Sequence, residues 1–267
     1  MAEARQPVVF FGHGSPMYAI EPNPYADHWA ALGASLPRPK AILCISAHWY
    51  TQGTGVTAMA QPRTIHDFGR FPQALFDVQY PAPGDPALAR RVADLLKPLD
   101  VVLDQSWGLD HGTWSVLLHA FPAADIPVIQ LSIDATKPAS FHYEIGKRLA
   151  PLRDEGILII GSGNVVHNLS LVKWRGETSA FDWASGFNSF VRNCIIKHEH
   201  GPLIAYEQLG EAAMLSAPTP DHYLPLLYVL GATRYDDAIA FPVDGIIMGS
   251  LSMLTVTAGH YPPAFSP

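Results

Sequence analysis

Twelve histidines stand in a chain of 267 residues that contains only two cysteines. Imidazole is the commonest metal ligand among side chains and the one most easily tuned as an acid or base near neutral pH. His13, His48 and His167 each follow a short apolar run that is typical of a buried β-strand. Ligands of open α/β sheets bind outside the carboxyl ends of the strands. Any one of these histidines alone is better explained as structural, but the three together predict a site.

Two further histidines lie at the start of predicted helices. His111 stands at the mouth of a helix expected over 113–121. His222 follows Thr219, which can cap a helix whose first residue is Pro220. On that helix the imidazole of His222 shares a face with apolar residues, and a polar ring on a buried face needs a partner. A metal ion and a backbone carbonyl are both suitable partners.

A loop and several aromatic residues form a weaker candidate for a substrate pocket. His66, Asp67 and Phe68 are consecutive in a predicted loop, and Trp49 and Tyr223 lie next to two of the histidines already named. These residues are expected to line an aromatic pocket. Aromatic side chains are equally common in protein cores, so packing is the alternative explanation.

The elements that must position these side chains alternate between strands and helices. Continuous apolar runs of this length are typical of strands that are covered on both faces. The pattern predicts an α/β fold: a single domain over residues 1–267, with a central, mostly parallel or mixed sheet flanked by helices. The expected strands are 7–11, 41–47, 127–133, 156–160 and 246–257. The expected helices are 24–33, 86–96, 113–121, 138–152, 181–196 and 220–231.

Composition argues against several classes of function. The net charge is −7 and basic residues do not cluster, so neither a nucleic acid nor a membrane surface is an expected partner. No apolar stretch reaches the roughly 18 residues of a membrane span, and the polar segment 1–6 is no signal peptide, which predicts a soluble cytoplasmic protein. The Gly-x-Ser-x-Gly motif of serine hydrolases is missing. Gly161 and Gly163 are expected to let the backbone approach the site closely.

Seven short segments are spread in order through nearly the whole chain: HGSP (13–16), SAHW (46–49), TIHDF (64–68), DHGTW (110–114), GNVVHN (163–168), TPDHYLP (219–225) and MGSLSM (248–253). Any one of the segments alone would be weak evidence, but the set in this order is highly specific. The set resembles the class III extradiol ring-cleavage dioxygenases, and within them most closely the bacterial 4,5-DOPA dioxygenase extradiol group.

The resemblance implies roles for five histidines. His13 and His48 match metal-binding histidines of the family, and His167 matches its catalytic histidine, which can also lie at the metal. His111 matches a second histidine near the substrate. His222 stands where the wider family has a glutamate ligand, a change shared by the DOPA-type group. The expected metal ligands are thus His13, His48, His167 and His222, and the expected catalytic residues are His167 and His111.

The implied reaction is cleavage of a catechol ring, with DOPA or a similar substituted catechol and O₂ as the small-molecule partners and both oxygen atoms incorporated. The implied cofactor is one divalent metal ion, Zn²⁺ as isolated or Fe²⁺ for dioxygenation, because histidine sites accept several divalent metals but Zn²⁺ has no redox chemistry. Two other functions stay open: a zinc-dependent hydrolase, and a non-catalytic metal-binding protein of the same fold.

Overall fold

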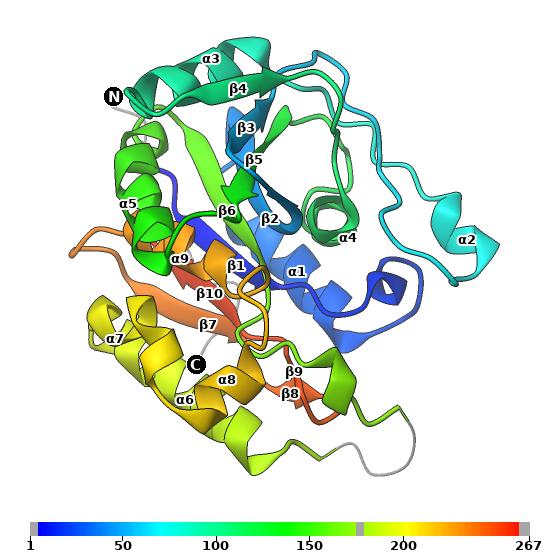
Figure 1. Ribbon diagram of the computed structural model, residues 1–267. Coiled ribbons are helices and arrows are strands. Elements are labelled where there is room, and N and C mark those ends of the chain that lie inside the picture. Colours follow the sequence, from blue (N-terminus) through cyan, green and yellow to red (C-terminus); the bar gives the residue numbers. More distant parts are fainter. Residues whose placement is uncertain (1–4, 175–178, 262–267) are drawn as a thin grey trace.

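An eight-stranded mixed sheet forms the centre of the computed structural model, which describes residues 5–174 and 179–261 (Figure 1). The strand order is β4-β3-β5-β2-β6-β1-β10-β7. The central strands β5, β2, β6 and β1 are parallel to one another, and antiparallel pairs occur toward both edges. The strands are β1 Val8–Gly12, β2 Ala41–Thr51, β3 Thr54–Thr57, β4 Val101–Asp104, β5 Val128–Asp134, β6 Ile157–Gly163, β7 Ile239–Val243 and β10 Thr255–Ala258. A separate two-stranded sheet pairs β8 Ile246–Ile247 with β9 Leu251–Ser252.

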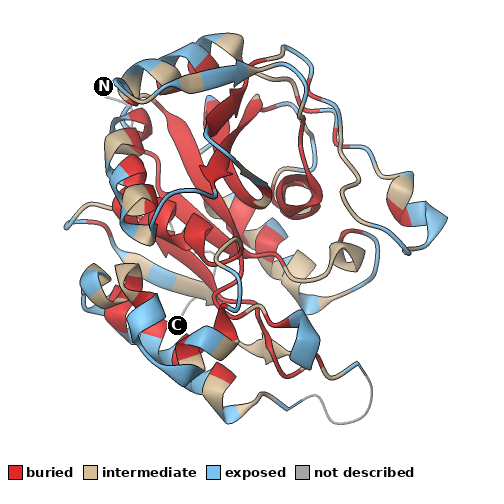
Figure 2. Ribbon diagram, viewed as in Figure 1, coloured by how far each residue is buried: buried red, intermediate tan, exposed pale blue. Residues whose placement is uncertain are grey.

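Helices cover both faces of the sheet. Alternate residues of a strand point to opposite faces, and accordingly Val8 packs into one core while Val9 packs into the other. Helices α1 and α4 pack on the face of Val9, and α5 and α9 on the face of Val8 (Figures 1 and 2). The α-helices are α1 Pro24–Ser35, α2 Gln73–Phe76, α3 Pro86–Leu95, α4 His111–Ala120, α5 Ala139–Leu149, α6 Asp182–Ile196, α7 His200–Ile204, α8 Glu211–Ser216 and α9 Leu224–Gly231. Short 3₁₀ helices are η1 Pro16–Ala19, η2 Ala150–Arg153, η3 Leu169–Leu171 and η4 Tyr206–Gln208.

The predicted α/β class, with helices on both faces of a mixed sheet, is confirmed, but several elements differ from their expected form. Strand β2 continues to Thr51, so His48 lies within the strand and not beyond it. The expected strand 246–257 is divided into β8, β9 and β10, because the chain turns at Met248 and Gly249, which both have positive φ. The edge strands β4 and β7 and the strand β3 beside β4 are not expected from the sequence; all three are short, and most of β4 and β7 is incompletely buried.

The expected helix 220–231 begins only at Leu224, so the prediction that Thr219 caps it is wrong. The backbone carbonyl of His222 accepts a hydrogen bond from the N–H of Asn164 at 2.8 Å. A helix running through this segment would use that carbonyl for its own ladder. His222 therefore lies in the turn before α9, bound to the segment that follows β6.

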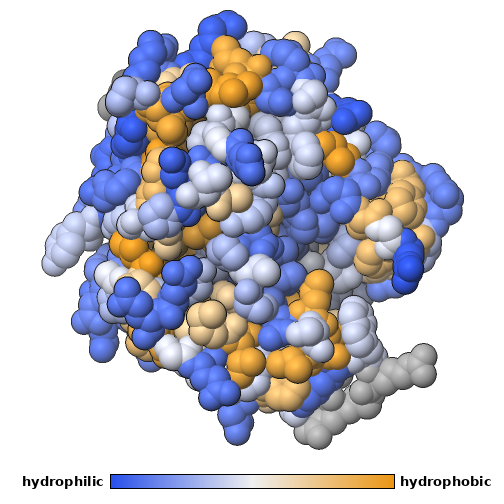
Figure 3. Space-filling model, viewed as in Figure 1, coloured by the Kyte–Doolittle hydropathy of each residue, from blue (hydrophilic) through white to orange (hydrophobic). Residues whose placement is uncertain are grey.

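The surface seen in Figure 3 is mainly hydrophilic, with apolar side chains in several separate patches. Within the described residues, none of the helices combines the length and the hydropathy that a membrane-spanning segment needs.

Helices α5 and α9 approach each other through glycines. A Cβ atom added to Gly146 of α5 would lie 2.2 Å from the carbonyl oxygen of Tyr228, and one added to Gly231 of α9 would lie 2.2 Å from that of Tyr143. Real Cβ atoms do not approach a backbone oxygen so closely. The two glycines therefore set the distance between the helices, and this fixes α9 and the turn that precedes it.

Replacing Gly146 by alanine should lower the free energy of unfolding by about 1–3 kcal/mol, because α5 and α9 must separate to admit the methyl group. The matched control is Gly186→Ala in α6, where an added Cβ meets nothing within 4 Å. There the better helix propensity of alanine should raise stability by about 0.5–1 kcal/mol. Urea unfolding followed by circular dichroism measures both; a Gly146→Ala protein as stable as the parent would contradict the tight-contact argument.

Candidate metal centre

Three adjacent strands of the sheet bring His13, His48 and His167 to the same region. His13 directly follows β1, and its backbone N–H donates to the carbonyl of Gly163 at the end of β6 (3.1 Å). His48 lies in β2 between Ile45 and Tyr50, where the pairing with β5 shifts register. His167 comes four residues after β6 ends. Because β2, β6 and β1 are parallel neighbours, their carboxyl ends meet at one edge of the sheet.

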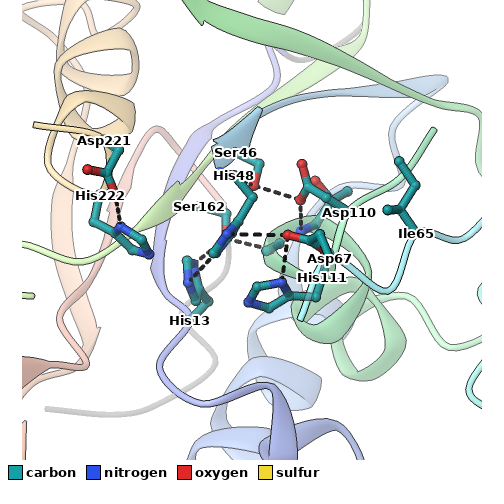
Figure 4. A network of polar contacts seen from close by, with 12 residues as sticks. His13, Ser46, His48, Ile65, Asp67, Asp110, His111, Ser162, Asp221 and His222 are labelled. Carbon is teal, nitrogen blue, oxygen red and sulfur yellow. Dashed lines mark hydrogen bonds and ion pairs between the residues drawn. The ribbon is translucent and has the colours of Figure 1, made fainter. Parts of the chain in front are cut away.

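The imidazoles of His13, His48 and His222 converge (Figure 4). The Nε2 atoms of His13 and His48 are 3.2 Å apart. The ring centroid of His222 lies 5.3 Å from that of His13 and 5.0 Å from that of His48. One ligand atom from each of the three residues lies within 4.8 Å of the others, a spacing that a single metal ion can bridge.

Hydrogen bonds fix the tautomer of His13. Its Nδ1 lies 3.0 Å from Oγ of Ser162, which is itself buried. The Ser162 hydroxyl donates its proton to the carbonyl of Gly112, so its oxygen accepts the Nδ1–H of His13. The Nε2 atom of His13 is then unprotonated, and its lone pair points toward His48.

Carboxylates influence the tautomers of His48 and His222. Nδ1 of His48 lies 3.3 Å from Oδ2 of Asp67, and Nδ1 of His222 is hydrogen-bonded to Oδ2 of Asp221. A carboxylate thus lies beside each Nδ1, which favours a proton on that nitrogen and leaves Nε2 without one. Two lone pairs that face each other across 3.2 Å repel unless a cation lies between them. This donor set, with a hydrogen-bonded partner behind each imidazole, fits a divalent metal ion.

Burial keeps the imidazoles of His13 and His48 neutral. It lowers the pKa of His13 well below its ordinary value, and the nearby His222, His111 and His167 lower this pKa further. The pKa of His48 is lowered in the same way, by burial first and then by His111. Neutral imidazole is the form that binds a metal.

Asp67 also holds His111, the first residue of α4. Its Oδ1 accepts the backbone N–H of His111 at 2.8 Å, and its Oδ2 accepts the ring Nδ1–H at 2.9 Å. Burial alone would raise the pKa of Asp67, but the hydrogen bonds from the ring and the backbone of His111 outweigh it and leave this pKa below its ordinary value. The ring centroid of His111 is 3.8 Å from that of His48, so the two imidazoles lie together over one carboxylate.

The start of α4 is fixed by Asp110, its N-cap residue. The buried carboxylate of Asp110 accepts hydrogen bonds from the N–H of Thr113 (3.1 Å), from Oγ of Ser46 (2.7 Å) and from Nε2 of Gln130 (2.7 Å). A Cβ on Gly112 would lie 2.4 Å from Oγ of Ser46. The start of α4 therefore lies directly against β2, and this contact delivers His111 to His48.

The ring of His167 stacks on that of His222 and does not point to the position where His13, His48 and His222 converge. The two ring centroids are 3.5 Å apart and the ring planes differ by 5°. Imidazole lone pairs lie in the ring plane, so parallel rings do not direct them to one point. Within the described residues no hydrogen bond reaches the His167 ring, and burial, followed by the neighbouring His222, lowers its pKa to about 3. His167 is thus a neutral ring with a free proton-accepting nitrogen.

Two of the residues expected to line a pocket lie near His111. The ring of Phe68 lies 5.4 Å from that of His111, edge to face. His66 packs against Phe68 at 5.8 Å, but one of its ring nitrogens, Nε2, is occupied by the carbonyl of Val78 at 2.9 Å. Phe68 is therefore placed to contact a molecule beside His111, and His66 supports it from behind.

The other two aromatic residues lie in different surroundings. Trp49 stacks on Trp107 with ring centroids 5.5 Å apart and planes within 6°. Tyr223 is fully buried against Tyr206 and donates its hydroxyl proton to the carbonyl of Leu203. The expectation that Tyr223 lines the pocket is wrong, because its side chain points into the core packed around α6–α9.

Sequence reasoning overlooked the partners of the histidines. Asp221 precedes His222 directly, and this adjacency was a usable signal. Ser162 is far from His13 in the sequence, and only the pairing of β1 with β6 brings them together. The expectation that Gly161 and Gly163 allow close approach is confirmed: a Cβ on Gly163 would lie 2.2 Å from the carbonyl of His222, and one on Gly161 2.6 Å from that of Pro225.

Comparison with known proteins places this site in a family. Residues 9–244 match the family described as "Catalytic LigB subunit of aromatic ring-opening dioxygenase". The chain is 56% identical over 263 residues to a protein of Escherichia coli K12 named 4,5-DOPA dioxygenase extradiol, with 97% of each chain covered. A protein of the same name from Beta vulgaris is 39% identical over 230 residues, covering 84% of this chain and 85% of the relative.

A solved structure agrees with the sequence comparison. The crystal structure of an uncharacterized protein from Escherichia coli K12 matches with a TM-score of 0.85 and 52% identity, covering 96% of this chain and all of that chain. The resemblance drawn from the seven motifs is thereby confirmed. The chain belongs to the family of the catalytic LigB subunit of aromatic ring-opening dioxygenases.

Proposed function

We propose that this protein is an extradiol dioxygenase that opens a catechol ring beside its two hydroxyls, with DOPA or a similarly substituted catechol as substrate. The observation that carries the proposal is the convergence of one ligand atom each from His13, His48 and His222, found in a chain of a ring-opening dioxygenase family. The names of two relatives, both 4,5-DOPA dioxygenase extradiol, support the choice of substrate.

His13, His48 and His222 would hold one divalent ion, Fe²⁺ for turnover, although an all-nitrogen set also suits Zn²⁺. When bound, an iron ion supplies Lewis-acid activation of the catechol oxygens and a route for electron density from the ring to O₂. The residues that would hold the ion lie among buried strands and beside α4, and this burial limits the conformations that their side chains can adopt.

His167 is proposed to move the proton. A substrate hydroxyl gives its proton to a free ring nitrogen of His167, and the same nitrogen returns it as the ring opens. Its stacking on His222 places it beside the ligand group without sharing the direction of the ligand lone pairs. His111, whose Nδ1 is held by Asp67, presents only Nε2 to a substrate and is the second candidate for this role.

Oxygen uptake tests the proposed function. Protein stripped of metal with a chelator and reloaded without air with Fe²⁺ should consume O₂ with DOPA and related catechols, and mass spectrometry should find the catechol plus both atoms of O₂ in the product. The Zn²⁺-loaded protein should consume none, because Zn²⁺ is redox-inert. Iron-loaded protein that takes up no O₂ with any catechol would contradict the proposal and favour a hydrolase or a binding protein.

Replacing His13 by glutamine should remove most of the bound metal, with affinity falling more than about 100-fold, because the loss of a ligand exceeds the 10–100-fold effect typical of an outer partner. The control is His119→Gln, since His119 is bonded to the backbone carbonyl of Tyr18 and belongs to none of the possible metal-holding groups. Elemental analysis of both purified proteins measures their metal content. Wild-type metal content in the His13 variant would exclude it as a ligand.

Replacing His167 by glutamine should lower kcat by about 10²–10⁴-fold while the metal remains bound, because a positioned acid–base group is worth that much. Metal content and single-turnover ring cleavage are measured on the same preparation. Normal turnover would transfer the proton-moving role to His111. Loss of the metal together with activity would show instead that His167 is a ligand.

A further inference from the structure

We propose that Asp67 is a positioning residue, whose single carboxylate holds the rings of His48 and His111 in the tautomer and orientation that the metal centre requires. The proposal rests on the proposed function only in taking His48 as a metal ligand. Asp67 itself would touch neither the ion nor the reacting atoms, in contrast to its expected place in the wall of a substrate pocket.

Both oxygens of Asp67 are used. Oδ2 lies 3.3 Å from Nδ1 of His48 and 2.9 Å from Nδ1 of His111, and Oδ1 accepts the backbone N–H of His111 at 2.8 Å. The three side chains are shielded from solvent, with side-chain exposures of 16% for Asp67, 19% for His48 and 7% for His111. A carboxylate accepts and does not donate, so the hydrogen bond from His111 requires a proton on its Nδ1, and the same oxygen favours a proton on the facing Nδ1 of His48.

The tautomer of His48 matters because a proton on its Nε2 would allow a hydrogen bond to His13. Its Nε2 is 3.2 Å from Nε2 of His13, a distance at which one imidazole can donate a hydrogen bond to the other. A proton on Nε2 of His48 would form this bond and occupy the lone pairs of both histidines at once. Asp67 draws the proton of His48 to the far nitrogen. It thereby prevents a bond between two prospective ligands that would exclude the metal.

The backbone contact adds a second constraint. His111 is the first residue of α4, and its N–H is one of the donors that a helix start leaves without an intrahelical partner. Because Asp67 accepts both this N–H and the ring Nδ1–H, the His111 ring is fixed relative to the helix axis. One carboxylate from the 64–72 loop thus ties β2 to α4 at the site.

The alternative is that Asp67 is a ligand itself, since His48, Asp67 and His111 also have a spacing that a metal ion can bridge. That arrangement would need both nitrogens of His48, one for each of two ions, and would displace the Nδ1 protons of two rings. The hydrogen-bonded arrangement needs neither change, and we therefore assign Asp67 a positioning role.

The test uses the full-length protein with ¹⁵N-labelled histidine and the variant Asp67→Asn, with Asp85→Asn as control. Asp85 caps α3, and asparagine caps equally well.

In metal-free wild type, long-range ¹H–¹⁵N spectra should show His48 and His111 protonated at Nδ1. In Asp67→Asn the His48 proton should move to Nε2, and Zn²⁺ affinity, measured by competition with a chromophoric chelator, should fall by about 10–100-fold. The control should match wild type in both measurements.

Three outcomes would overturn the proposal. The first is a wild-type His48 that carries its proton at Nε2, a result that needs no variant and so stands even if Asp67→Asn does not fold. The second is an Asp67→Asn protein with unchanged tautomers or unchanged Zn²⁺ affinity. The third is binding of two Zn²⁺ per chain in wild type and one in the variant, which would make Asp67 a ligand. None of these measurements requires turnover, so a protein that cleaves no catechol would refute the proposed function and leave this result intact.

Discussion

The site depends on one electrostatic constraint: buried, neutral imidazoles whose unprotonated nitrogens face one another. The Nε2 atoms of His13 and His48 are 3.2 Å apart, and the other nitrogen of each ring faces Ser162 or Asp67. Such an arrangement is unfavourable without a cation, so the fold must impose it. The rest of the structure can be understood as the means by which these rings are held in place.

Parallel strands and closely packed glycines hold the imidazoles in this arrangement. Because β2, β6 and β1 are neighbours, the residues at their carboxyl ends are fixed by the hydrogen-bond ladder of the sheet. Gly163 lets the turn that carries His222 approach the end of β6, and Gly112 lets the start of α4 approach β2. Each close contact is between backbone atoms or short side chains. The imidazoles consequently have little freedom to turn away from one another.

What the sequence predicts well is what depends on local pattern. Continuous apolar runs identified β1, β2, β5 and β6, and the histidines near the ends of these runs include two of the three converging rings. The partners of those rings were harder to find, because Ser162 and Asp67 reach the histidines across the fold and no periodicity links them. His222 lies before α9 because its backbone carbonyl accepts a hydrogen bond from the N–H of Asn164. Helix-capping residues and the spacing of apolar residues in the sequence cannot reveal such a contact.

The two carboxylates behind the histidines determine the charge of the centre. Hydrogen bonds from His111 and His222 leave the pKa values of Asp67 and Asp221 below their ordinary range in spite of burial, so both are ionised at neutral pH. If His13, His48 and His222 hold a divalent ion, these two negative charges would balance the charge of the ion while the coordinating atoms remain neutral nitrogens. In the proposed reaction the catechol proton would be taken up inside the site, and the ring of His167, stacked on His222, lies beside these groups.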